Sequence, residues 1–222
     1  MKMRRAADML GVNRKTVARK ARFLSAIARL EHHELLKTQA HRLKKLQLDE
    51  MESFEHTKCK PLSIPLIVDQ ETRLILALGV CQMPAKGPLA EISRRKYGPR
   101  PNERVPALRS LLRDVRYYTD QIESIRSDSH PYYPPLIKEV FPKAVHDTVK
   151  SRRAASTGQG ELKKGRWDPI FSLNHTAAMF RDNVSRLVRR TWATTKRRDR
   201  LGDHMYLYVV WHNRKILETL RP

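Results

Sequence analysis

Acidic residues, cysteines and long apolar runs are all scarce in this 222-residue chain. Its two cysteines, Cys59 and Cys81, form no CxxC pair, which excludes a disulfide scaffold and a zinc site built from cysteine alone. No run approaches the ~18 apolar residues of a membrane-spanning helix, and the basic N-terminus lacks the apolar core of a signal peptide. These absences predict a soluble, intracellular protein of the cytoplasm.

Basic residues, by contrast, are abundant. Lysine and arginine number 45 against 23 aspartates and glutamates, and the formal net charge of +22 predicts a polyanionic partner. The excess is uneven, because residues 1–45 carry +10 and residues 171–222 carry +7, whereas residues 46–130 carry only +1. Central carboxylates repel phosphates. The pattern therefore favours basic ends that hold nucleic acid around a middle segment whose acids bind metal ions.

The first 24 residues have the pattern of a partial helix-turn-helix. Residues 4–10 have helical composition, Gly11 permits a tight turn, and Asn13 can cap a second helix over residues 14–20. That helix would present four basic side chains to DNA, namely Arg14, Lys15, Arg19 and Lys20. The alternative is a solvated basic helix in a helical hairpin. We expect the module to be incomplete, since the chain begins too late to supply the supporting helix that normally precedes such a pair.

A linker helix is expected over residues 25–45, followed by an α/β domain over residues 46–222. Within this domain the periodicity predicts strands over 46–56, 62–69, 74–81, 122–126 and 144–149, and helices over 102–119, 134–140, 173–191 and 200–217. The first three strands are typical of an antiparallel meander. Residues 151–168 are polar, basic and contain glycine, so they predict a flexible loop that orders on DNA.

Three polar residues lie where an α/β core can bring them together. Asp49 stands in the first predicted strand, Asp128 follows the fourth, and Asn174 opens a late helix. Phosphodiester chemistry uses two divalent ions about 4 Å apart, held mainly by carboxylates on rigid strands. Asp49 can bridge such ions and Asp128 can hold one of them. The alternative interpretation of an acid at a strand end is a cap or turn residue.

Five segments carry a family resemblance: LDEMESFEHT, IVDQETRLILALGV, IRSDSHPYYP, NHTAAMFRDNVSRLVRRTW and YVVWHN. In this order, behind a helix-turn-helix, they resemble the bacterial insertion-sequence transposases of the DDE type. The chain is most similar to the group with a zinc ribbon and a helix-turn-helix upstream of the catalytic core. The resemblance implies an RNase H-like mixed sheet flanked by helices, preceded by a small helical helix-turn-helix segment. It also implies that this chain is truncated before that segment.

The resemblance implies roles for four residues. It places the first and second metal-binding acids on Asp49 and Asp128, and the third ligand, usually glutamate, on Asn174. Arg181 stands seven residues after Asn174, so the two share one helix face, and Arg181 can reach the phosphate of a bound strand. The alternative for Arg181 is an ordinary surface arginine.

Asparagine in place of the third acid has a chemical consequence. An amide oxygen can coordinate Mg²⁺ but brings no negative charge, so the second ion would be held more weakly or would depend on Glu50, Glu52 or His175. His130 and Tyr132 either orient the phosphate or pack the end of their strand. Further basic residues are expected to hold the DNA backbone, namely Arg186, Arg189, Arg190 and Lys196.

The implied function is a DNA transposase that cleaves the ends of an insertion sequence and joins them to target DNA. Its cofactor would be Mg²⁺ or Mn²⁺, with two ions bound, and its partners would be terminal inverted repeats, target DNA and a second copy of itself on DNA. No membrane is involved. The alternative is a truncated, catalytically impaired relic that only binds DNA. A transcription regulator is a third possibility, although it would have no need of Asp49 and Asp128.

Overall fold

The computed structural model describes residues 3–149, 168–188 and 193–220. In these residues a mixed sheet of six strands has the order β3-β2-β1-β5-β6, with β4 paired to β2. The strands are β1 (Lys45–Phe54), β2 (Pro61–Asp69), β3 (Ile75–Leu78), β4 (Cys81–Gln82), β5 (Ser124–Asp128) and β6 (Val145–Val149). Antiparallel pairs join β1 to β2 and β2 to β3, whereas β1, β5 and β6 run parallel. The expected α/β class and the antiparallel meander are confirmed.

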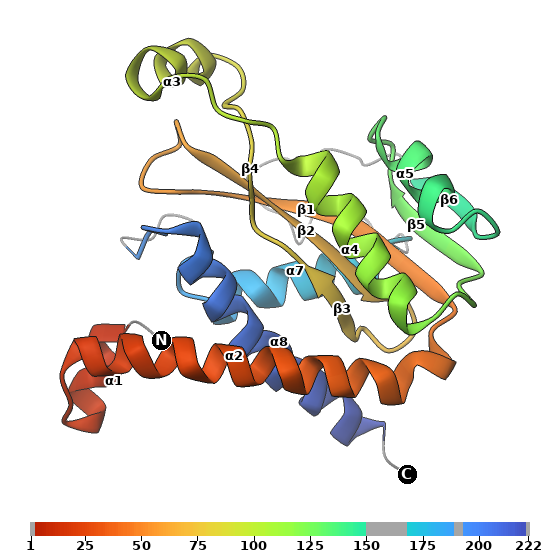
Figure 1. Ribbon diagram of the computed structural model, residues 1–222, viewed down its shortest axis with the longest axis horizontal. Helices are drawn as coiled ribbons and strands as arrows, with labels where there is room; N and C mark the ends of the chain where they lie inside the picture. Colours follow the sequence, from red (N-terminus) through yellow and green to blue (C-terminus); the bar gives the residue numbers. More distant parts are fainter. Residues whose placement is uncertain (1–2, 150–167, 189–192, 221–222) are drawn as a thin grey trace.

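Helices cover both faces of this sheet. Those of the described residues are α1 (Met3–Leu10), α2 (Arg14–Gln39), α3 (Leu89–Tyr97), α4 (Arg104–Tyr118), α5 (Tyr133–Val140), α7 (Phe171–Asn183) and α8 (Arg198–Thr219), with a short 3₁₀ helix η1 (Ala40–Arg42). Figure 1 shows α4 and α5 over one face and α7 behind the other, while α2 crosses α8 along the margin of the molecule. None of the described helices is long and apolar enough to span a membrane.

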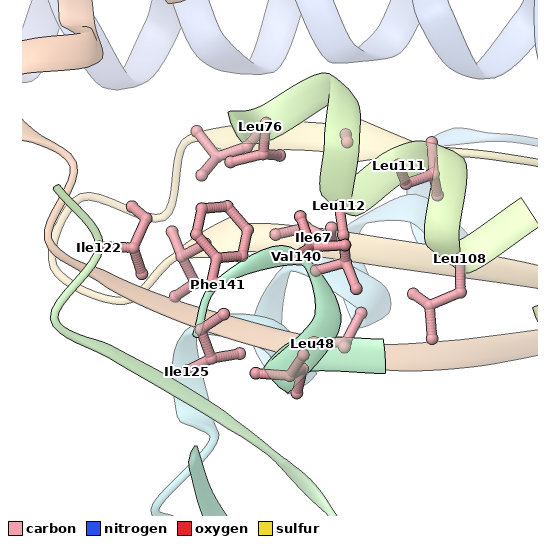
Figure 2. Close-up of a cluster of buried hydrophobic side chains, with 14 of the residues drawn as sticks. Leu48, Ile67, Leu76, Leu108, Leu111, Leu112, Ile122, Ile125, Val140 and Phe141 are labelled. Carbon is pink, nitrogen blue, oxygen red and sulfur yellow. The ribbon is translucent and has the colours of Figure 1, made fainter. Parts of the chain in front are cut away.

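Two apolar clusters lie on opposite faces of the sheet. Figure 2 shows Leu48 of β1 and Ile67 of β2 in the cluster with Leu108 and Leu112 of α4. The second cluster joins other side chains of β1 and β2 to α7 and α8, including the fully buried Phe180. Successive side chains of a strand point to opposite faces. Because both faces of β2 are covered, its sequence is an almost continuous apolar run.

The N-terminal helices form as the residues predict, but with different boundaries. Gly11 adopts a left-handed φ of 60°, and Oδ1 of Asn13 accepts a hydrogen bond from the N–H of Lys15 at 2.8 Å, which caps α2. The helix then runs unbroken to Gln39, where the pattern predicts two helices. Ala21 and Arg22 are both good helix formers, so nothing interrupts the chain there.

Two further helices differ from expectation. The predicted helix over 173–191 is wrong over residues 184–188, because Val184 is extended and Leu187 donates to its carbonyl at 2.7 Å in the turn that follows. Residues 189–191 lie outside the described residues. The side chains of Val184 and Leu187 both remain buried. Their spacing in the sequence therefore resembles that of apolar residues in a longer helix. Helix α3 was not predicted. It lies beyond the β1–β2 hairpin (Figure 1), where Oγ of Ser93 donates to the carbonyl of Cys59 at 2.6 Å.

At the outer edge of strand β3, backbone groups form hydrogen bonds with a side chain of α8 and not with another strand. Asn213 of α8 is fully buried, its Oδ1 accepts from the N–H of Ile75, and its Nδ2 donates to the carbonyl of Ile75, both at 2.9 Å. The amide thus takes the place of a neighbouring strand at Ile75. This arrangement also protects the edge from pairing with another chain.

Replacing Asn213 by leucine is expected to lower the free energy of unfolding by about 2–4 kcal/mol, because two buried backbone groups of Ile75 lose their partners. Denaturant unfolding measures the change. The matched control on the same helix is Arg214→Leu, which removes only an exposed ion pair with Glu31 and should cost less than about 1 kcal/mol. Equal losses in the two variants would contradict a specific role for the amide.

Candidate active site

Asp49, in the middle of β1, and Asp128, the last residue of β5, lie side by side on two parallel strands. Leu48 of β1 pairs with Ser127 of β5, and the two aspartates are the next residues in each strand. Burial is the main cause that raises the pKa of Asp49 to about 6, and the charges of Asp128 and Glu50 raise it further, against a 2.7 Å hydrogen bond from the Glu50 N–H. The structure therefore brings together the two acids that the sequence singles out.

The start of helix α7 is anchored on the same face of the sheet. The carbonyl of Pro169 accepts hydrogen bonds from Nε2 of Gln47 at 3.2 Å and from Nη1 of Arg126 at 3.0 Å. Gln47 and Arg126 stand two residues before Asp49 and Asp128, so the alternation of strand side chains puts all four on one face. The anchor places the beginning of α7 beside the pair of carboxylates.

Asn174 is bonded to a residue that the sequence pattern assigned to a flexible loop. Oδ2 of Asp168 accepts from Nδ2 of Asn174 at 2.9 Å, and its Oδ1 accepts from the N–H of Ile170 at 3.1 Å. Asp168 therefore stabilises the turn that precedes α7, and an acid just before a helix is the signal that could have identified it. The rest of the predicted loop, residues 151–167, lies outside the described residues. Within them, no direct bond joins Asn174 to Asp49 or Asp128.

The two flanks of α7 carry different groups. Asn174 and Arg181 both belong to this helix, and their spacing of seven puts them on one flank. His175 points to the other flank, where its Nδ1 lies 3.4 Å from Nη1 of Arg73, and burial together with that guanidinium lowers its pKa. The flank of Asn174 is therefore the one that faces away from Arg73 and the β2–β3 turn.

Glu50 is held in a buried polar cluster on the opposite face of β1. Its carboxylate accepts two hydrogen bonds from the Arg104 guanidinium, one from Tyr132 at 2.6 Å and one from Ser63 at 2.8 Å. The side chains of Glu50 and Arg104 are only 4% and 10% exposed. Burial acts to raise the pKa of Glu50, but these donors lower it overall. Glu50 is thus not available to support a second ion.

The other expected helpers are also engaged. Glu52 pairs with Lys86 at 2.9 Å on the surface, and His175 contacts Arg73. Tyr132 lies under the Arg104 guanidinium at 4.9 Å and against the ring of His130 at 3.9 Å, so it packs the strand end. The hydroxyl of Tyr133, by contrast, lies 3.5 Å from Oδ1 of Asp49 and 3.4 Å from Oε2 of Glu50. The Tyr133 hydroxyl therefore lies between the carboxylates of Asp49 and Glu50, which stand on opposite faces of β1.

The expected DNA-binding residues fall into three groups. Five are exposed, namely Arg14, Lys15, Arg19 and Lys20 on α2 and Lys196 before α8. Arg186 is half-buried, and burial together with the nearby charge of Arg200 lowers its pKa. Arg189 and Arg190 lie outside the described residues.

Asp49 and Asp128 offer carboxylate oxygens, the ligands that Mg²⁺ and Mn²⁺ prefer. Among the described residues, no group of three or more His, Cys, Asp or Glu side chains is close enough to hold a metal ion. The site offers two carboxylates, and the Asn174 amide stands on the helix that is anchored to the same face of the sheet. That set fits an ion that retains several waters, as Mg²⁺ usually does.

Comparison with known proteins adds nothing to this description. No model of a protein family matches the chain, and no curated protein matches it.

Proposed function

We propose that the chain is a DNA transposase of an insertion sequence, with an RNase H-like core, that cuts element ends and joins them to target DNA. The observation that carries this proposal is the adjacency of Asp49 and Asp128 on the face where α7 is anchored. Two neighbouring carboxylates repel each other, and a divalent cation would relieve that repulsion. The mixed sheet flanked by helices supports the core assignment, and the net charge of +22 supports a DNA substrate.

Asp49, Asp128 and Asn174 are the residues that would hold Mg²⁺ or Mn²⁺. Two such ions activate the attacking oxygen and stabilise the leaving oxygen in phosphoryl transfer. The pKa of about 6 leaves Asp49 ionised at neutral pH. Asp168 accepts from Nδ2 of Asn174, so the amide oxygen remains as the acceptor that a cation requires. Arg181, on the same flank of α7, would hold the phosphate of the strand.

The DNA itself would be held by exposed basic side chains away from the carboxylates. Those at the start of α2 and Lys196 before α8 would contact phosphates, which fixes the position of a duplex without reading its sequence. Inverted repeats, target DNA and a homodimer assembled on DNA complete the proposal.

Purified protein is expected to nick supercoiled DNA only when Mg²⁺ or Mn²⁺ is added, and Asp49→Ala and Asp128→Ala should each lose this activity by at least about 100-fold. Gel analysis of plasmid relaxation measures it. Glu139→Ala, which removes an exposed acid paired with Arg109 and Arg113, is the matched control and should retain activity. Unchanged nicking in both aspartate variants would refute the assignment.

The runner-up is a DNA-binding relic, and the asparagine at position 174 favours it because the amide brings no charge. Filter binding with and without Mg²⁺, together with nicking by Asn174→Glu, separates the two. A relic binds DNA equally well without metal, and it gains nicking activity only when glutamate is restored.

A further inference from the structure

Helix α2 carries an apolar stripe on the side that faces away from the rest of the molecule. Its buried residues, Ser25, Ala28, His32 and Leu36, share one face. On the opposite side Phe23, Ile27 and Leu30 are 61%, 37% and 68% exposed. Helical spacing puts these three in one line. With Lys20 before them and Glu34 after them, they have the alternating spacing of three and four that seams between paired helices use.

The stripe cannot turn inward, because α2 is fixed on its other side. Oγ of Ser25 donates to Asp203 of α8 at 3.2 Å, and Nε2 of His32 bonds the carbonyl of Leu76 at 3.0 Å. Figure 1 shows the helix along the margin of the molecule. The exposed line of apolar side chains is therefore a fixed feature of the folded chain.

Charge along α2 indicates what covers the stripe. The first half is basic and exposed, with Arg14, Lys15, Arg19, Lys20 and Arg22, whereas the second half holds both acids of the helix, Glu31 and Glu34, together with Arg29 and Lys37. Two copies of α2 that cross in antiparallel fashion at Ile27 would place each basic half against the half of the other copy that holds both acids. Lys20 and Glu34 stand seven residues before and after that crossing point and would face each other. A parallel pair would oppose like charges.

We infer that α2 is a dimerisation helix that pairs with the α2 of a second copy, antiparallel, about a two-fold axis at Ile27. Such an interface is isologous, so one stripe serves both protomers. Among the residues that the structure describes, Glu34 forms an ion pair with the exposed Lys37, a pair worth little and easily exchanged. This dimer requires neither DNA nor metal and does not rest on the proposed function.

Sedimentation of the full chain without DNA tests the inference. Wild type is expected to show a monomer–dimer equilibrium, and Ile27→Glu should raise its dissociation constant by at least about 30-fold. Ile92→Glu is the matched control, since Ile92 is 46% exposed on α3 and should leave the equilibrium unchanged. Circular dichroism checks that each variant stays folded. A wild-type protein that is monomeric up to roughly 200 µM would overturn the inference. The same holds if the stripe binds another protein while the chain itself stays monomeric.

Charge exchange tests the antiparallel orientation. Lys20→Glu and Glu34→Lys should each weaken the homodimer by about tenfold, because each places two like charges in contact at both ends. Mixing the two variants, or combining them in one chain, should restore wild-type affinity. A parallel pair would oppose like charges before and after either substitution, so unchanged affinity in both single variants would overturn the proposed geometry. Because no DNA or metal is present, failure here leaves the nicking experiment unaffected.

Discussion

Replacing Asp49 by asparagine is expected to stabilise the fold at pH 7 while abolishing metal-dependent DNA cleavage. Burial and the neighbouring charges raise the pKa of Asp49 from 3.8 to about 6. At ~1.36 kcal/mol per pKa unit, the ionised side chain lowers the free energy of unfolding by about 2–3 kcal/mol, and asparagine removes that loss. Denaturant unfolding and the nicking assay, run on the same preparations, measure the two effects.

The dependence on pH has a definite sign. Between about pH 4 and pH 6 the folded state keeps a proton on Asp49 that the unfolded chain has already released. The free energy of unfolding should therefore fall as the pH rises through this window and stay constant above it. In Asp49→Asn that fall disappears, whereas the exposed Asp120→Asn should retain it.

Added Mg²⁺ distinguishes a metal site from a residue that is merely strained. If Asp49 and Asp128 hold the ion, Mg²⁺ at ten times its dissociation constant should stabilise the wild type by about 1.4 kcal/mol and leave Asp49→Asn unchanged. If the Asp49→Asn variant is more stable but inactive, Asp49 is retained for its chemistry at a cost in stability. An Asp49→Asn variant less stable than wild type at pH 7 would contradict this reading.

The position of the two aspartates could be predicted because strand topology follows from local patterns. The alternating and apolar runs identify β1, β2 and β5, and the residues before Asp49 and Asp128, Leu48 and Ser127, pair across the parallel strands β1 and β5. Asp49 and Asp128 therefore meet as expected. Asn174 could be placed only on a helix, since the contacts that fix the start of α7, such as the Pro169 carbonyl shared by Gln47 and Arg126, join residues far apart in the sequence. Nothing local marks that contact.

Other features depend on contacts between residues far apart in the chain. Arg104 follows Glu50 by more than fifty positions, and no periodicity connects them. A signal was present, however, because Leu46, Leu48 and Glu50 alternate on one face of β1, and an acid on a buried face needs a partner. The sequence pattern does not predict the continuity of α2. Its change from basic to apolar residues resembles a helix boundary, although no residue breaks the helix.

Replacing Arg104 by methionine is expected to lower the free energy of unfolding by about 3–5 kcal/mol, because Glu50 is left as a buried charge without its cation. The double variant Glu50→Leu/Arg104→Met removes both charges and should recover most of that loss. Arg109→Met is the matched control on the same helix, since it breaks an exposed pair with Glu139 and should cost at most about 1 kcal/mol. Denaturant unfolding of the four variants, including Glu50→Leu, closes the double-mutant cycle.

The same cycle decides whether Glu50 takes part in chemistry. If it serves only to bind Arg104 and Tyr132, the double variant should nick DNA at close to the wild-type rate per folded molecule. A metal ligand would behave differently, because its loss abolishes activity whatever the stability. Loss of nicking in a folded double variant would therefore place Glu50 in the site with Asp49. Full activity would leave Asp49 and Asp128 as the carboxylates that the reaction needs.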